Sequence, residues 1–409
     1  MAGPLDGIKV LDLSRVLAGP WASQTLADLG ASVIKIERPK TGDDTRAWGP
    51  PYAKDAVGNE TTESAYFLSA NRGKKSVTVD ITSAQGQAIV TALAEKSDIV
   101  IENFKVGALS KYRLDYATLS RLNPRLIYCS ITGFGQSGPY AHLPGYDFMI
   151  QGLGGLMSIS GLPDGVAGAS PMKTGVAVAD LFSGMYAATA ILAALNRRHA
   201  TGRGDFIDIA LLDVQVAMLA NQAMNYLTTG TPPQRLGNAH PNIVPYEVFA
   251  VSDGHIVLAV GNDQQFAAFC AVADLDHLAA DPRFAANRAR VKNRLALIPL
   301  IAKTLLTRKK TDWLTALNAT NVPCGPINDM AAVFADPQVR DRGLELKLGH
   351  SIAGTVPSVA SPMRFASGLQ SQVATSGPPA LGEHTEDVLQ DQLGLSRAQI
   401  LSLSQQNVV

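Results

Sequence analysis

Asp180 is the only charged residue between Lys173 and Arg197, and it stands at the front of a long run of small and apolar residues. A carboxylate in such surroundings loses hydration, so it must be paired, cap a helix, have a raised pKa or take part in chemistry. The residues from 181 to 199 predict a helix, and aspartate is a favoured N-cap that complements the positive helix end. From this segment alone, a cap is the simpler interpretation and a catalytic carboxylate is the alternative.

Basic residues form a second group with chemical potential, because they flank predicted strands. Arg38 follows the predicted strand 32–36, and Arg72, Lys74 and Lys75 adjoin the predicted strand 76–81. Ligands of open parallel sheets bind outside the carboxyl ends of the strands, where an arginine suits a phosphate group. A solvated basic turn is the alternative interpretation.

Gly133 and Gly135 belong to a segment that matches the dinucleotide-binding fingerprint literally. The segment follows a predicted strand, but Pro139 and Pro144 interrupt the helix whose N-terminus the pyrophosphate would need. We therefore interpret residues 132–138 as a mobile glycine loop and do not predict a nicotinamide site.

Composition excludes several other classes of protein. Lys+Arg and Asp+Glu are both 35, so the chain has no bulk attraction for nucleic acid or an anionic membrane. The three cysteines lie far apart and the seven histidines show no ligand spacing, so no metal site is predicted and a reducing, cytoplasmic location is expected. No signal peptide is visible, and the longest apolar stretch, 181–195, is too short to cross a bilayer.

The order of predicted elements indicates an α/β protein with more than one domain. Helical segments at 84–95 and 116–122 alternate with strands, a rhythm typical of a parallel sheet covered on both faces. A turn-rich stretch near 230–242 then leads into a mixed segment, so we divide the chain of 409 residues into a large domain, 1–224, and a smaller α+β domain, 225–330. The predicted strands lie at 8–13, 32–36, 76–81, 99–102, 126–131 and 205–210, and a further helix is predicted from 212 to 227.

Several short motifs, taken in order, make the chain similar to the class III CoA-transferases, the family of formyl-CoA transferase and the carnitine CoA-transferases. Each motif is short, but their order and spacing are specific and span essentially the whole chain. They lie at residues 4–13, 18–20, 33–39, 71–76, 101–104, 175–180, 202–204, 323–326 and 381–385.

The resemblance implies a fold and an assembly. Members are interlaced homodimers in which each subunit has a Rossmann-like large domain built from both termini and a smaller middle domain. By this resemblance, residues 331–409 return to the large domain.

The resemblance also implies roles for individual residues. Asp180 falls on the aspartate that becomes acylated, and the segment with Arg72, Lys74 and Lys75 is expected near the CoA phosphates. Lys111 stands where formyl-CoA transferase has an arginine. The other positions that correspond to CoA contacts are Val16, Arg38, Asn103 and Phe104.

The implied chemistry is covalent transfer of CoA through an aspartyl-CoA thioester. Backbone N–H groups at a helix start or at the loop of Gly133 and Gly135 suit the developing oxyanion. With the resemblance added, Asp180 is expected to be catalytic, with capping as a further role. A CoA thioester is expected as substrate, and no tightly bound cofactor is expected.

The resemblance narrows the substrates to succinyl-CoA as donor and a small dicarboxylate, such as glutarate or itaconate, as acceptor. Arg46, Arg72 and His240 are conceivable partners for a second carboxylate. An α-methylacyl-CoA racemase is one alternative, although Tyr146 replaces the histidine that such enzymes place before Asp147. A non-catalytic CoA-binding protein is the other alternative.

Overall fold

The computed structural model describes residues 3–366 and 376–409, and its contacts divide the chain into two compact units. The first unit comprises Met1–Leu156, Thr174–Thr228 and Pro337–Val409, and the second comprises Met157–Lys173 and Thr229–Asp336. The domain limits that we drew from the sequence stay a prediction.

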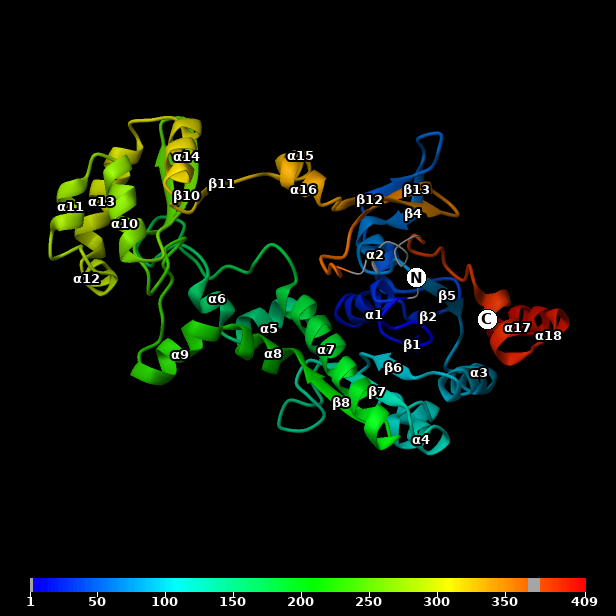
Figure 1. Ribbon diagram of the computed structural model, residues 1–409. Helices are drawn as coiled ribbons and strands as arrows, with labels where there is room; N and C mark the ends of the chain where they lie inside the picture. The colour runs from blue at the N-terminus through cyan, green and yellow to red at the C-terminus, as the bar shows by residue number, and fades with distance from the viewer. Residues whose placement is uncertain (1–2, 367–375) are drawn as a thin grey trace. The chain divides into compact units, whose positions relative to one another are not determined.

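Six parallel strands form the central sheet of the first unit (Figure 1). Their order, β5-β2-β1-β6-β7-β8, is that of the doubly wound nucleotide-binding fold, so the predicted Rossmann-like α/β architecture is confirmed. The order reverses between β1 and β6, and such folds bind ligands in the crevice at that point. The strands are β1 (Lys9–Asp12), β2 (Ser32–Glu37), β5 (Lys74–Thr78), β6 (Ile99–Glu102), β7 (Ile127–Thr132) and β8 (Asp205–Ala210).

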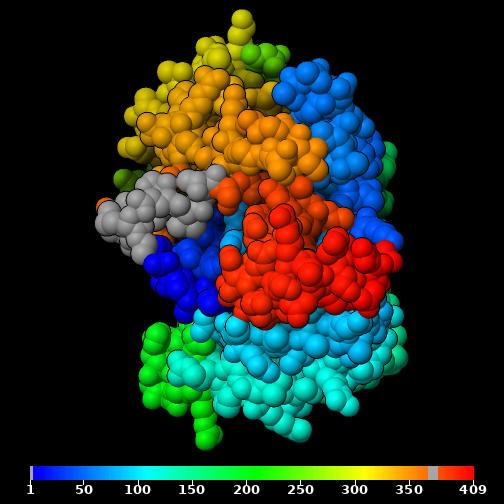
Figure 2. All heavy atoms as spheres, turned by 90° about the vertical axis from the view of Figure 1, so that its right-hand side faces the viewer, coloured from blue at the N-terminus to red at the C-terminus, as the bar shows by residue number. Residues whose placement is uncertain are grey.

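Helices cover both faces of this sheet because successive strand residues point to opposite sides. Val10 packs in the core beneath α1 (Ala18–Asp28) and α7 (Val178–Thr201). Leu11 packs in the opposite core, with α3 (Ala84–Glu95), α4 (Tyr116–Leu122), α17 (Thr385–Leu393) and α18 (Arg397–Gln405). Figure 2 shows the C-terminal helices, in red, against the surface that contains α3.

The small residues of α7 allow it to pack closely against α1. A Cβ atom at Gly184 would lie 2.7 Å from the carbonyl oxygen of Ala18, so only glycine permits this approach. Among the residues that the structure describes, α7 is the one helix long and apolar enough to cross a membrane, yet it contributes Ala187 and Ile191 to the first core.

The structure corrects the sequence-based elements in three places. The helix predicted from 212 to 227 is two helices, α8 (Leu211–Met218) and α9 (Ala220–Thr229), because Ala220 adopts a φ of 44°. Two hairpins were missed, since their strands are short and largely exposed. They are β3 (Tyr52–Lys54) with β4 (Glu60–Ser64), and β12 (Glu345–His350) with β13 (Gly354–Val359).

The second unit combines a three-stranded antiparallel sheet with helices, as an α+β domain does. Trp313, Phe266 and Phe269 lie in its core. Its strands are β9 (Tyr246–Val251), β10 (Gly254–Ala259) and β11 (Cys324–Pro326), and its helices include α10 (Asp263–Val272), α11 (Asp276–Ala280), α12 (Asn287–Lys292), α13 (Arg294–Leu305), α14 (Lys310–Ala319) and α15 (Met330–Ala335).

Two 3-10 helices, η1 (Asp44–Ala47) and η2 (Ser110–Tyr112), and four short α-helices complete the described chain. The four α-helices are α2 (Ala65–Ser69), α5 (Asp147–Leu153), α6 (Leu156–Ile159) and α16 (Pro337–Asp341).

Candidate active site

Two adjoining cavities lie at the carboxyl ends of the strands of the first unit. The first, of about 280 Å³, borders the segments that follow β1, β2 and β5. The second, of about 160 Å³, borders the turns after β1, β6 and β7 and contains Asp180. Arg15 and Phe104 line both cavities, so the two spaces meet at these side chains.

Asp180 is the third residue of α7 and does not cap it. The N-cap position belongs to Ala177, and Asp147 Oδ1 accepts the Ala179 N–H at 2.8 Å. The capping function that the sequence suggested for Asp180 is therefore supplied by Asp147. Within the part of the chain that the structure describes, no hydrogen bond to the Asp180 carboxylate is found.

The surroundings of Asp180 make its carboxylate harder to ionise. Burial, followed by the negative charge of Asp147, raises the pKa of Asp180 to about 7. Burial and then the charge of Asp180 raise the pKa of Tyr66 to about 12. A raised pKa marks a poorly solvated carboxylate, which is a better nucleophile once ionised.

A buried amide fixes the segment that leads into α7. Gln151 donates to Asp147 Oδ2 at 2.7 Å, and its own amide oxygen accepts the Thr174 N–H at 3.0 Å. Gln151 is fully buried, so this arrangement holds α5 and the front of α7 together. Local sequence patterns could not show this role of Asp147, because its partner Ala179 lies 32 residues away.

Val16 occupies a strained turn after β1 that lines the second cavity. Its φ is 70°, a left-handed value that costs a β-branched residue free energy. The Val16 N–H donates to the Asp43 carboxylate at 3.2 Å, while Asn103 Oδ1 accepts the Arg15 N–H at 2.8 Å and Asn103 Nδ2 donates to the Arg15 carbonyl at 2.6 Å. Asn103 thus ties the turn after β6 to the turn after β1, where the strand order reverses.

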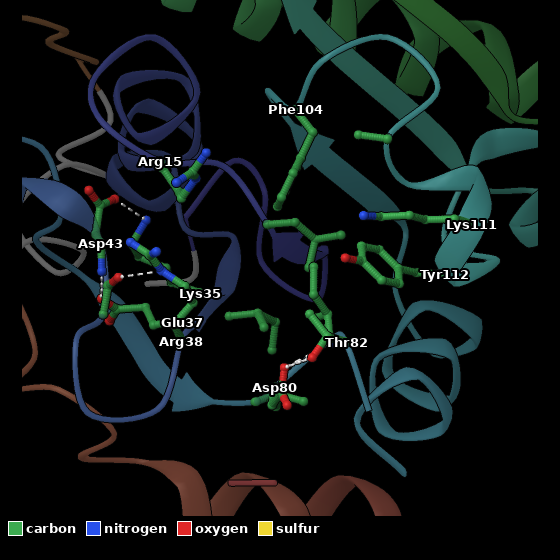
Figure 3. A pocket seen from close by; sticks show the side chains of 16 residues that line it. Arg15, Lys35, Glu37, Arg38, Asp43, Asp80, Thr82, Phe104, Lys111 and Tyr112 are labelled. Carbon is green, nitrogen blue, oxygen red and sulfur yellow. Dashed lines mark hydrogen bonds and ion pairs between the residues drawn. The ribbon is translucent and has the colours of Figure 1, made fainter. Parts of the chain in front are cut away.

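The first cavity combines an apolar lining with cations. Arg38 and Lys111 line it from different elements, and Lys111 and Tyr112 lie on the side opposite Asp43 (Figure 3). The Lys111 ammonium lies 4.5 Å from the centre of the Tyr112 ring. Apolar walls with a few cations suit a nucleotide carrying phosphate groups.

Three of the predicted CoA contacts lie away from both cavities. Arg72 pairs with Asp28, and Lys74 pairs with Asp12, in each case with both side chains buried. Lys75 lines a separate small cavity with Lys9, at the amino end of the sheet. The reason is the direction of β5, which brings the residues after its carboxyl end, Val79, Asp80, Ile81 and Thr82, into the first cavity.

Two of the residues considered as partners for the second carboxylate of a dicarboxylate substrate already contact other side chains. Arg46 is buried between Glu37, at 2.8 Å, and Glu63, at 3.3 Å. His240 belongs to the second unit, where its ring lies 5.2 Å from that of Tyr246.

The two glycines of the predicted oxyanion loop differ in their surroundings. Gly133 lines the second cavity, beside Gly145. The Gly135 N–H donates to Thr132 Oγ1 at 2.9 Å, so it is not available to an oxyanion in this arrangement. Gly133 is therefore the better placed of the two.

The sequence from 5 to 385 matches the family described as CoA-transferase family III. The chain belongs to this family. It is 52% identical over 387 residues to the succinate–glutarate CoA-transferase of Agrobacterium fabrum, covering 94% of this chain and 95% of the relative. It is 44% identical over 390 residues to the human succinyl-CoA:glutarate CoA-transferase, covering 95% of this chain and 86% of the relative.

A solved structure supports the same assignment. The crystal structure of a CAIB/BAIF family protein from Brucella suis is similar with a TM-score of 0.81 and 49% identity, covering 96% of this chain and all of that one. The protein is thus a CoA-transferase, and the comparisons favour transfer over racemisation or non-catalytic binding.

Proposed function

We propose that this enzyme transfers CoA from succinyl-CoA to a small dicarboxylate, with glutarate as the first candidate, through a covalent thioester on Asp180. The observation that carries the proposal is the unbonded, poorly solvated Asp180 carboxylate in a cavity that adjoins a cationic one. The names of the Agrobacterium and human relatives support the choice of substrates.

The proposed reaction proceeds by carboxylate and thiolate exchange. The Asp180 carboxylate attacks the thioester carbonyl, which gives a mixed anhydride and expels CoA thiolate. The thiolate attacks the aspartyl carbonyl, forms the aspartyl-CoA thioester and releases the donor acid. The acceptor carboxylate and the thiolate then repeat both steps in reverse order, so Asp180 is regenerated as a carboxylate and no water is consumed.

The proposed binding residues follow from the two cavities. Arg38 and Lys111 would hold the nucleotide part of the donor in the first cavity, beside the Phe104 ring. Val16 and Asn103 would border the path to Asp180 in the second, where a Gly133 N–H would face the developing oxyanion.

We also propose an interlaced homodimer in the cytoplasm, with no tightly bound cofactor and no nucleic-acid or membrane partner. Exposed aromatic side chains on α5 and α7, Phe148, Phe182 and Tyr186, support self-association. The free thiols of Cys129, Cys270 and Cys324 fit a reducing compartment.

A panel of acceptor acids tests the substrate assignment. With succinyl-CoA as donor, glutarate and itaconate should have kcat/KM values at least about tenfold above butyrate, the scale of one lost polar contact. Equal values for butyrate would contradict the dicarboxylate preference, and absence of transfer to every acid would contradict succinyl-CoA as donor.

A further inference from the structure

Arg15 lies at the junction of the two cavities, and the proposed transfer reaction does not use its side chain. Its guanidinium lies 5.4 Å from the centre of the Phe104 ring, and both side chains line both cavities. Its Nε is buried and has no hydrogen-bond partner among the described residues. A guanidinium with an unused donor at this position has capacity for an anionic ligand.

Arg15 and Arg38 converge on the two oxygens of one carboxylate. Arg15 Nη1 lies 2.8 Å from Asp44 Oδ2, and Arg38 Nη2 lies 2.5 Å from Asp44 Oδ1. All three side chains remain at least 36% exposed, so solvent screens these ion pairs and each contributes little to stability. Two guanidiniums that reach one anion also have the arrangement that binds a phosphate group.

Hydrogen bonds hold the backbone of Arg15 in place, whereas its guanidinium is partly exposed to solvent. Asn103 bonds both the N–H and the carbonyl of Arg15, so the guanidinium can change partner without movement of the turn. In the proposed binding mode, the nucleotide of the donor lies in the first cavity and its thioester reaches Asp180 in the second. The part of the CoA molecule that joins the nucleotide to the thioester must then pass Arg15.

We propose that Arg15 binds phosphate oxygens of the CoA donor at the junction of the two cavities, and that Asp44 is an internal counter-ion which the phosphate displaces from Arg15. The inference rests on the proposed function, because it needs a CoA thioester that spans both cavities. The position of Arg15 between the cavities favours the diphosphate over the 3′-phosphate.

Substitutions of Arg15 and of Asp44 test this proposal, because they are expected to change CoA binding in opposite directions. Binding of free CoA is measured by calorimetry, and KM is measured separately for succinyl-CoA and for the acceptor acid. Arg15→Gln should weaken CoA binding and raise the donor KM about tenfold or more, with the acceptor KM unchanged. Asp44→Asn should strengthen CoA binding by up to about fivefold, since it removes a competing carboxylate from an exposed pair.

Arg197 and Asp205 provide matched controls, because they form an exposed arginine–aspartate pair that lines neither cavity. Arg197→Gln and Asp205→Asn should leave CoA binding unchanged. Arg15→Lys keeps the positive charge but cannot form two parallel hydrogen bonds, so it should weaken CoA binding less than Arg15→Gln does. It also replaces the glutamine variant in the test if that variant does not fold. Dephospho-CoA distinguishes the phosphates: a persistent effect of Arg15→Gln assigns the diphosphate, whereas a lost effect assigns the 3′-phosphate.

Unchanged CoA binding in Arg15→Gln and Arg15→Lys would overturn the proposal. Weaker binding in Asp44→Asn would overturn the displacement, because Asp44 would then order the two arginines for the ligand. Failure of the unsubstituted enzyme to bind CoA would instead contradict the proposed function.

Discussion

Asp180 depends on three features of its surroundings for its proposed reactivity. It lies in the first turn of α7, it is poorly solvated, and Asp147 rather than Asp180 bonds the free N–H at the helix start. The helix N-terminus favours the ionised form, while burial and the charge of Asp147 oppose it. Burial and then the charge of Asp147 raise the pKa of Asp180 to about 7.

We predict that the donor kcat/KM rises with pH through about 7, because only the ionised Asp180 attacks and its pKa is raised to about 7. Asp147→Asn removes the neighbouring negative charge but keeps an oxygen for the Ala179 N–H. The pKa of Asp180 should then fall, and the rising limb should move to lower pH. A pH profile that is flat from pH 5.5 to 8, or a limb that moves upward in Asp147→Asn, would contradict the proposed role of Asp180.

Arg38→Ala should weaken binding of the donor more than binding of the acceptor. The expected loss is roughly 1.5–3 kcal/mol, the range for a hydrogen bond to a charged group. Initial rates at varied succinyl-CoA and varied acid separate the two KM values. If Arg38 touches the 3′-phosphate, dephospho-CoA thioesters should reduce the difference. An unchanged donor KM would remove Arg38 from the site.

At the level of elements, the carboxyl ends of five strands, β1, β2, β5, β6 and β7, and the start of α7 create the site. The turns after β1 and β6 meet through Arg15 and Asn103, and the segment after β2 brings Asp43 to Val16. The loop after β7 and the loop before α5 touch through their glycines. A Cβ at Gly145 would lie 2.2 Å from the Gly133 Cα, so the second cavity depends on this close approach.

Gly145→Ala should therefore separate these loops, with a loss of about 1–3 kcal/mol in the free energy of unfolding and a marked fall in transfer. Gly349→Ala is the control, since Gly349 has no positive φ and a Cβ there would meet nothing within 4 Å. Urea unfolding and transfer assays on both variants check the expectation. Equal behaviour of the two variants would show that the contact at Gly145 is unimportant.

Sequence patterns predicted the elements whose signals are local. The strand Ile99–Glu102 and the helix Ala84–Glu95 have the predicted limits, because a buried apolar run and a Ser83 cap mark them directly. The hairpins β3–β4 and β12–β13 carry no such run. Asp180 was found because an isolated charge in an apolar segment is visible in the sequence.

Contacts between residues that are far apart in the sequence could not be predicted from local patterns. Arg15 and Asp44 are 29 residues apart and meet only because β1 and β2 are neighbours. Arg72, Lys74 and Lys75 lie near the amino end of β5, whereas the first cavity borders the residues that follow its carboxyl end. Contact of these three residues with CoA stays a prediction.

At the scale of the whole molecule, we predict a dimer that persists on dilution to nanomolar concentration. Interlaced subunits bury more surface than a standard interface, and Phe182 and Tyr186 on α7 are 46% and 47% exposed in the single chain. Light scattering and analytical ultracentrifugation across a dilution series measure the assembly. A stable monomer would contradict the interlaced arrangement.

Trapping of the covalent intermediate shows directly whether Asp180 is the nucleophile. The enzyme is incubated with succinyl-CoA and hydroxylamine and then digested for peptide mass analysis. A thioester or anhydride on Asp180 predicts a hydroxamate on that residue, and Asp180→Asn should fold, carry no hydroxamate and lose several orders of magnitude in transfer. A hydroxamate on another residue, or near-normal transfer by Asp180→Asn, would contradict catalysis by Asp180.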